Sequence, residues 1–361
     1  HHLVNDGLMT LFFFVVGLEI KRELLRGELS DPRVAALPAL AALGGMVVPA
    51  GIFALMTAGS PVGHGWGIPM ATDIAFALSV LAVMRSRLPS ALSIFMLTLA
   101  VVDDVGAIFV IAIFYGGSLR LVPLAIACLL VFVTFALRSL RVDWAPAYLV
   151  LAIATWYATY RSGVHPTIAG VALALTTPTV ALARAEVVRR WAQLLGDEPE
   201  GRDVHQVSIL AREASSPAEY LEALLHPAVS FVVLPLFALA NAGITFDSDL
   251  FGSASSGKLI LALVASLVIG KTFGIALGAW VGVRTGVAML PTGVTWRHIV
   301  GAAMLGGIGF TVSLFVAGLA FPSGPISDAA RIGVVIASVL SACLGTVMLF
   351  GARRRGSETA A

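Results

Sequence analysis

The sequence predicts an all-α membrane protein: a multi-helix bundle with inverted repeats and two discontinuous, broken helices that cross at the midplane of the bilayer. Of its 361 residues, 58% are hydrophobic and only 12% are charged, and the mean hydropathy is +0.94. Soluble domains carry about a quarter charged residues, and a soluble core of this length has no room for so much apolar side chain, so lipid must be the solvent. The other two observations are a series of long apolar stretches and two interruptions at matching places among them.

Eleven apolar stretches follow one another along the chain. Most are about 17 to 25 residues long, which is what a helix needs to cross roughly 30 Å of hydrocarbon at about 1.5 Å per residue. Strands of a membrane barrel would show about ten residues of alternating hydrophobicity, which these runs do not. The predicted spans are residues 3–20, 34–58, 66–84, 91–114, 121–137, 144–160, 165–182, 220–242, 259–283, 299–321 and 329–350.

Basic residues alternate between the loops that join these stretches. Alternate loops hold 18 Lys and Arg residues, the loops between them hold 3, and Lys271 and Arg331 fall within spans. Loops rich in Lys and Arg stay in the cytoplasm, so the C-terminus is expected to be cytoplasmic. The predicted organisation is an N-terminal membrane half of seven spans over residues 1–182, a cytoplasmic loop over 183–219, and a C-terminal half of four spans with a short basic tail over 220–361.

Four ionisable residues lie deep inside apolar stretches: Asp73, Asp103, Asp104 and Lys271. Each is expected near the bilayer midplane, where a charged side chain costs about 2.5 to 3.5 kcal/mol on insertion scales. One interpretation is a stabilising ion pair between Lys271 and an aspartate. Three carboxylates against one ammonium leave a surplus of negative charge that pairing does not cancel, and this favours a site visited by cations, either protons or metal ions.

The adjacent aspartates, Asp103 and Asp104, point about 100° apart if they lie on a helix, so they do not face the same spot equally. One arrangement has Asp104 as the cation ligand and Asp103 as the partner of Lys271. Desolvation and mutual repulsion oppose the attraction of the lysine, and the cluster then titrates as a coupled unit. Protons and a hard cation, which prefers oxygen ligands, are expected to compete for the same carboxylate oxygens.

Two of the stretches contain backbone breakers. Pro69 precedes Thr72 and Asp73 in the third stretch, and a glycine-rich run, residues 306–309, lies in the middle of the tenth. Each interrupted stretch is the second of three consecutive ones, numbers two to four and nine to eleven of the series. Broken segments at corresponding places in two halves are typical of transporters built from inverted repeats, and the unwound backbone at the break supplies carbonyl ligands where it lines a cavity.

Seven short motifs are spread along the chain: GLEIKREL at 17–24, ATDIAFAL at 71–78, VDDVGA at 102–107, SGVH at 162–165, LPLFALANAG at 234–243, GK at 270–271 and GIGFT at 307–311. Together and in this order they resemble the NhaA family of sodium–proton antiporters. The resemblance covers essentially the whole chain except the long loop. It is not independent of the repeat argument, because NhaA is one of the transporters that define that pattern. The family has twelve helices, so the resemblance implies that this chain is a fragment lacking the first transmembrane helix.

The resemblance implies a secondary transporter, not an enzyme, that exchanges cytoplasmic sodium or lithium for external protons by alternating access at an aspartate site. It also implies electrogenic exchange, activation at alkaline pH, a homodimer in the bacterial inner membrane, no cofactor and no nucleic-acid partner. Within the site, Asp103 and Asp104 are expected to hold the sodium ion. Thr72 and Asp73 are expected at the crossing of the broken helices, with Lys271 compensating charge there.

A second group of charges, Glu19, Arg22 and Glu23, lies on one face at the cytoplasmic end of the first stretch, with the helical spacing i, i+3 and i+4. From these residues alone, a solvated helix end explains the pattern. The resemblance implies instead a cytoplasmic funnel and pH-sensing cluster, which Glu222 joins from across the cytoplasmic face. The chain departs from the family pattern around Glu222, where relatives carry further basic residues and this chain has Glu219 and Ala223.

Three other functions stay open at this point. A sodium-coupled solute symporter of related fold would also bury charges, but the adjacent acidic pair argues against it. An intramembrane aspartyl protease would use Asp73 with Asp103 or Asp104 as a catalytic dyad, although the Gly-x-Gly-Asp signature is missing. A light-driven pump would carry retinal on Lys271, whereas such pumps have seven helices and an aromatic pocket and here glycine and threonine flank the lysine.

Overall fold

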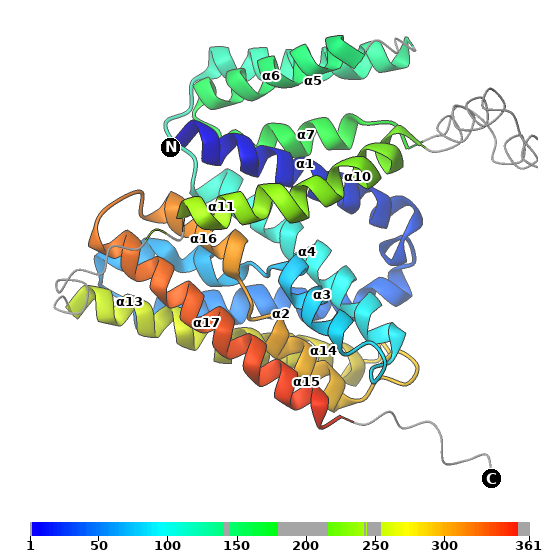
Figure 1. Cartoon of the computed structure of the whole chain (residues 1–361), viewed down its shortest axis with the longest axis vertical. Coiled ribbons are helices and arrows are strands. Elements are labelled where there is room, and N and C mark those ends of the chain that lie inside the picture. The colour runs from blue at the N-terminus through cyan, green and yellow to red at the C-terminus, as the bar shows by residue number, and fades with distance from the viewer. Residues whose placement is uncertain (1, 141–144, 180–215, 242, 244–253, 353–361) are drawn as a thin grey trace, which may run out of the picture. The chain divides into compact units, whose positions relative to one another are not determined.

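The computed structural model describes residues 2–140, 145–179, 216–241, 243 and 254–352. All regular secondary structure among these residues is helical, and they include no strand (Figure 1). The prediction of an all-α protein is therefore confirmed. Most of the predicted cytoplasmic loop, residues 183–215, lies outside the described part.

Each of the eleven predicted stretches coincides with one helix, with helical segments that continue one another, or with a bent pair of helices. Five helices of the described part are long and apolar enough to cross a membrane, and the number rises to seven if each bent pair is one span. Two further apolar helices there are shorter. The chain is thus a multi-span membrane protein, while the count of eleven spans stays a prediction.

Contacts within the chain define two compact units, each made of two separate segments. The first consists of His1–Arg22 and Gly116–Pro235, and the second of Glu23–Tyr115 and Leu236–Ala361. The predicted halves, residues 1–182 and 220–361, divide the chain in a different way, by the order of the spans along the sequence. The division into these two membrane halves stays a prediction.

The first unit contains five α-helices and a π-helical turn in its described part. Helix α10 begins with a capping box, in which the Ser216 hydroxyl accepts from the Glu219 amide at 3.2 Å and the Glu219 carboxylate accepts from the Ser216 amide at 3.1 Å. Figure 1 shows α5 and α6 side by side. The elements are α1 (His2–Arg26, as far as Arg22), α5 (Leu121–Ser139), α6 (Ala145–Ser162), α7 (Thr167–Thr176), α10 (Pro217–Ala228) and η3 (Val229–Val233).

The predicted span over 165–182 is wrong at its C-terminal end, because α7 stops at Thr176 and has only 10 residues. Thr177 is extended, with φ −63° and ψ 137°, and Pro178 follows it. A residue before proline disfavours the helical conformation, since the proline ring clashes with the preceding backbone. The predicted span extended to residue 182 because it was based on apolar composition alone, which does not register the effect of Pro178 on the helix.

The second unit holds all four intramembrane ionisable residues. Its elements are η1 (Glu28–Ser30), α2 (Pro32–Met56), η2 (Pro61–Met70), α3 (Ile74–Val83), α4 (Ser90–Phe114), most of α11 (Leu234–Asn241), α13 (Ala254–Val264), η4 (Ala265–Gly270), α14 (Lys271–Arg284), α15 (Trp296–Leu305), α16 (Phe310–Ala320) and α17 (Pro325–Phe350). Segments η1 and η2 are 3₁₀ helices, and η4 is a π-helical turn that leads directly into α14.

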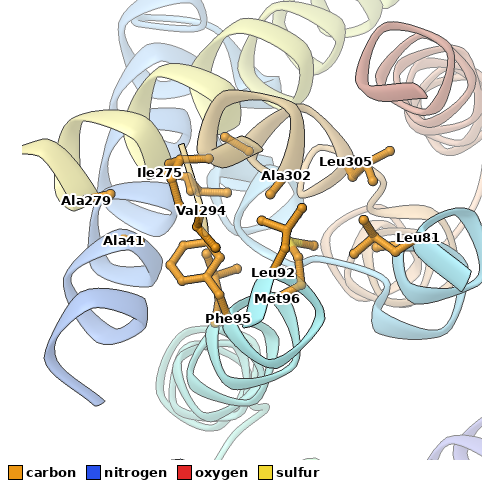
Figure 2. Packing of buried hydrophobic residues seen from close by; sticks show 14 of the residues in the cluster. Ala41, Leu81, Leu92, Phe95, Met96, Ile275, Ala279, Val294, Ala302 and Leu305 are labelled. Atoms are coloured by element: carbon orange, nitrogen blue, oxygen red, sulfur yellow. The ribbon is translucent and has the colours of Figure 1, made fainter. Parts of the chain in front are cut away.

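The core of this unit lies between α2, α4, α14 and α15. Figure 2 shows Leu92, Phe95 and Met96 of α4 beside Ile275 of α14 and Ala302 of α15, and all five side chains are buried. Between apolar helices in lipid, close packing supplies much of the association energy. This shared core holds α4, with the adjacent aspartates, and α14, which begins with Lys271, in one packed unit.

Glycines bring α14 into backbone contact with α2. A Cβ atom on Gly274 would lie 2.2 Å from the Gly44 carbonyl oxygen, and one on Gly278 would lie 2.2 Å from the Leu40 carbonyl oxygen. Only residues without a side chain fit at such a distance, and small residues four apart are the usual means of close helix packing in membranes. The glycines thus fix which face of α14 turns inward, and with it the direction of Lys271.

Two spans are broken, as the sequence predicts. Helices η2 and α3 are bent by 43° at their junction, and α15 and α16 by 45° at theirs. The two breaks touch: the Asp73 amide donates to the Ile308 carbonyl at 2.6 Å, and the Thr72 hydroxyl lies 2.9 Å from the Gly306 carbonyl oxygen. Discontinuous helices that meet at their breaks are confirmed, and their relation by an inverted repeat stays a prediction.

Candidate functional site

The centre of the site is an ion pair between Lys271, the first residue of α14, and Asp103 of α4. The Lys271 ammonium donates to Asp103 Oδ2 and to the carbonyl of Met70 at the end of η2. The Lys271 and Asp103 side chains are both 0% exposed. The predicted arrangement with Asp103 as the partner of the lysine is therefore the one that the structure has.

Thr72, in the unwound stretch after η2, holds the same carboxylate from a second side. Its hydroxyl oxygen lies 2.5 Å from Asp103 Oδ2 and 2.9 Å from the Gly306 carbonyl oxygen. Because a hydroxyl has one proton, it donates to only one of these acceptors at a time. Thr72 therefore links the carboxylate helix to the breaks of both broken spans.

The other oxygen of the same carboxylate, Asp103 Oδ1, is buried and has no hydrogen-bond partner among the described residues. Nearly all buried polar atoms in proteins have a partner, and an exception points to a ligand, a water or a function. Asp104, the next residue of α4, is also buried, and its charge acts on the Lys271 ammonium. The carboxylates are thus placed where a hard cation or a proton finds oxygen ligands.

Asp73 lies at the breaks themselves and caps two helices. As the N-cap of α3 it accepts from the Phe76 amide at 3.3 Å, and its other oxygen accepts from the Thr311 hydroxyl and, at 2.9 Å, from the Thr311 amide at the start of α16. Helix N-termini carry a partial positive charge and orphan amides, so a carboxylate between two of them is favourable. The sequence placed Asp73 at the crossing, but its contact with the second half-helix comes from the fold.

These four groups carry two more negative than positive charges when all are ionised. Asp73, Asp103 and Asp104 are each at most 2% exposed, and Lys271 is 0% exposed. Helix ends compensate Asp73, and the lysine compensates Asp103. Among the described residues, no group of three or more His, Cys, Asp or Glu side chains of the kind that holds a resident metal ion is present. The surplus negative charge and the buried carboxylate oxygens suit a cation.

The second predicted cluster lies mainly in the first unit, at the end of α1 and on α10. Arg22 forms an ion pair with Glu222, and the Glu19 carboxylate lies 3.7 Å from the imidazole of His226. Glu23, which begins the second unit, accepts from the Glu28 amide at 3.1 Å. The structure thus brings Arg22 and Glu222 together as predicted and adds His226.

His226 was missed by the analysis of the sequence, although a signal for it was available. It follows Glu222 by four residues on the same helix, and residues four apart lie on one helix face. The helical spacing from Glu222 therefore places His226 beside it without reference to the fold.

Two broken helices that meet around buried carboxylates and a buried lysine define a secondary transporter of ions. The family described as Na+/H+ antiporter 1 matches residues 1–349, and the chain belongs to that family. This membership confirms the resemblance to NhaA. Antiporters are transporters and not enzymes, so the protease interpretation is wrong. Membership in an antiporter family likewise replaces the interpretation as a light-driven retinal pump.

Relatives in this family match nearly the whole chain. The Na(+)/H(+) antiporter NhaA of Rhodopirellula baltica is 44% identical, over 97% of this chain and 80% of its own length. The Na(+)/H(+) antiporter NhaA 3 of Acidiphilium cryptum is 43% identical, over 99% of this chain and 82% of its own length. Among solved structures, the sodium proton antiporter MjNhaP1 from Methanocaldococcus jannaschii at pH 8 has a TM-score of 0.45 and 16% identity, over 96% of this chain and 87% of that one.

Proposed function

We propose that this chain exchanges cytoplasmic sodium or lithium for external protons by alternating access, with Asp103 and Asp104 occupied in turn by the cation and by protons. The observation that carries the proposal is Asp103 Oδ1, a buried carboxylate oxygen with no hydrogen-bond partner among the described residues. The other oxygen, Asp103 Oδ2, accepts hydrogen bonds from Lys271 and Thr72. These bonds fix the carboxylate in position and leave Oδ1 for a ligand. A proton or a hard cation satisfies such an oxygen.

Exchange follows from competition at these carboxylates. In a site of low dielectric constant, a bound cation and protons on the same carboxylates repel one another strongly, so each form of the site excludes the other. Asp104 is the proposed cation ligand beside Asp103, with the Thr72 hydroxyl as a further oxygen nearby. Lys271 holds the carboxylate in place and takes part in the charge balance of the site. The exchange is electrogenic because more protons than cations move in each cycle.

The setting of the site in the membrane is also a proposal. The distribution of Lys and Arg among the predicted loops supports a cytoplasmic C-terminus in the bacterial inner membrane. Residues 1–182 and 220–361 form the proposed membrane halves on either side of the cytoplasmic loop. The protein works as a homodimer, as the resemblance implies, without a cofactor.

The first test is exchange itself. Everted membrane vesicles that contain the full-length protein are energised to form a proton gradient, and sodium or lithium chloride is then added. We expect either cation to collapse the gradient within seconds, with no effect in vesicles that lack the protein. Verified protein in the membrane without any cation-dependent collapse would refute the proposal. Sodium uptake that requires an organic solute would instead favour a symporter.

The alkaline activation is proposed to depend on the charges at the end of α1. The Glu19 carboxylate lies 3.7 Å from the His226 imidazole, and Arg22 forms an ion pair with Glu222, so these contacts join α1 to α10.

Replacing His226 with Gln is expected to shift the pH profile of exchange, because it removes one side of a contact that joins α1 to α10. His226 is more than half exposed, and exposed pairs of this kind contribute only about 0.2 to 1 kcal/mol, so the shift should be small. The measurement is the rate of sodium-driven gradient collapse at a series of pH values. Glu19→Gln removes the partner of the same pair and should shift the profile in the same direction; profiles that stay in place in both variants would contradict this role.

A further inference from the structure

The hydroxyl of Tyr115 makes two hydrogen bonds to the backbone of η2. It accepts from the Gly67 amide at 3.1 Å and donates to the His64 carbonyl at 2.9 Å. Tyr115 is the C-cap residue of α4, the helix that carries Asp103 and Asp104. The carboxylate helix and the first half of a broken span are therefore joined directly through one side chain.

Aromatic contacts strengthen this junction. The ring of His64 lies 5.3 Å from that of Tyr115, and the ring of Trp66 lies 4.9 Å from that of Phe114 in an edge-to-face arrangement. A Cβ atom on Gly67 would lie 2.8 Å from the Tyr115 hydroxyl oxygen and 2.9 Å from its ring, so only glycine leaves room for the phenol. We call these five residues the aromatic latch.

Segment η2 needs an external support of this kind. It is a 3₁₀ helix of 10 residues, whereas runs beyond three or four residues are uncommon because the hydrogen-bond geometry of this helix is poor. Its C-terminal end is tied to the site: the Met70 carbonyl accepts from Lys271, and the Ile68 carbonyl accepts from the Ser313 hydroxyl at 2.8 Å. Tyr115 holds the middle of the segment, at His64 and Gly67, so η2 is fixed both there and at its end beside the site.

We propose that Tyr115 is a positioning residue for ion exchange: by latching η2 to α4, it sets the place of Thr72 and of the Met70 carbonyl relative to Asp103 and Lys271. This inference rests on the proposed function, since positioning matters only if the carboxylates bind the cation. Tyr115 itself does not touch those carboxylates among the contacts that the structure gives. It acts on the cation through the segment that ends at Thr72.

The latch keeps its donor across the whole working range of pH. Burial raises the pKa of Tyr115 to about 12, so the phenol stays protonated at neutral and alkaline pH. The hydrogen bond to the His64 carbonyl is therefore present under the conditions in which an exchanger of this family would be active. Because this hydrogen bond does not change with pH, it keeps η2 in the same position while the carboxylates gain and lose protons.

The test is Tyr115→Phe in the full chain, purified and reconstituted in proteoliposomes. The ring stays, but the Gly67 amide and the His64 carbonyl lose their partner inside the protein. We expect the sodium concentration for half-maximal exchange to rise at least about fivefold at constant pH, the factor that corresponds to about 1 kcal/mol. The maximal rate should change much less. The matched control is Tyr157→Phe, which removes the hydroxyl of an exposed tyrosine that accepts from the Arg161 guanidinium at 3.3 Å.

A second variant and a second measurement separate positioning from simple support of the fold. Gly67→Ala keeps the hydroxyl but leaves no room for it, and it should raise the same sodium requirement. Amide hydrogen exchange over residues 61–72 should become faster in Tyr115→Phe and stay unchanged in Tyr157→Phe. A variant with lower thermal stability but the original sodium requirement would overturn the proposal, because Tyr115 would then only support the fold. Unchanged amide exchange over residues 61–72 would overturn it as well.

The same experiment distinguishes this inference from the function on which it rests. If the unsubstituted protein shows no sodium-dependent proton movement in the proteoliposomes, the proposed function fails, and amide exchange alone decides whether the latch exists. If the unsubstituted protein exchanges and Tyr115→Phe has the same sodium requirement, the function stands and the positioning role of Tyr115 is refuted.

Discussion

Replacing Asp104 with Asn is expected to abolish sodium-driven proton movement while leaving the protein folded. The change keeps the size of the side chain but removes the negative charge and one protonation site from the proposed cation site. Both partners of the ion pair between Asp103 and Lys271 are kept, so this buried pair stays in place. We expect a loss of exchange rate of at least about a hundredfold, with a melting temperature close to that of the unsubstituted protein.

Asp103→Asn should abolish exchange as well but should also destabilise the fold, because it leaves the Lys271 ammonium buried without its counter-charge. Removing one partner of a buried ion pair typically costs about 3 to 5 kcal/mol. Gradient collapse in everted vesicles measures the exchange, and thermal unfolding in detergent measures stability. A suitable control is Asp328→Asn, which removes a carboxylate in the first turn of α17 that lies 3.7 Å from Arg331 and should leave exchange unaffected. Unimpaired exchange in both site variants would refute the assignment.

The second large effect is expected for Lys271→Met, which should lower the free energy of unfolding by about 3 to 5 kcal/mol by leaving Asp103 buried and charged. Exchange should be weakened or its coupling ratio changed. The double variant Asp103→Asn with Lys271→Met removes both charges, and we expect it to recover most of the lost stability but none of the exchange. This pattern separates the contribution of the ion pair to folding from its contribution to transport.

Thermal unfolding of the two single variants and the double variant, measured side by side at one pH, tests this prediction. Lys258→Met provides the matched control, because Lys258 is exposed on α13 and its loss should leave the melting temperature unchanged. If Lys271→Met were as stable as the unsubstituted protein, or if the double variant were less stable than both single variants, the buried pair would not contribute as described.

Local sequence features predicted the elements of this site because each of them has a local cause. Pro69 and the glycines of residues 306–309 each weaken a helix locally, and both spans are broken there. An aspartate or lysine in the middle of an apolar stretch is at membrane depth by its place in the chain alone. The adjacency of Asp103 and Asp104 likewise allows only one of them to face the lysine directly.

Local features failed where a distant residue supplies the reason. Nothing near Asp73 indicates that it caps α16, because Thr311 is 238 residues away in the chain. The role of Tyr115 is similar: a tyrosine at the end of an apolar helix is ordinary until Gly67 makes room for its hydroxyl. The early end of the span over 165–182, by contrast, has a local cause, Pro178, but the prediction followed the apolar composition instead.

The sequence by itself determined that this chain is a helical membrane protein with buried charges and two broken spans, because hydropathy, proline and glycine act over a few residues. Only the tertiary structure decided which oxygen each charge touches. Lys271 and Asp103 are 168 residues apart, and their contact depends on the packing of α14 against α2 and of α4 into the same core. Hydrogen bonds require atoms to be placed within a few tenths of an ångström, and only the packed fold fixes positions that closely.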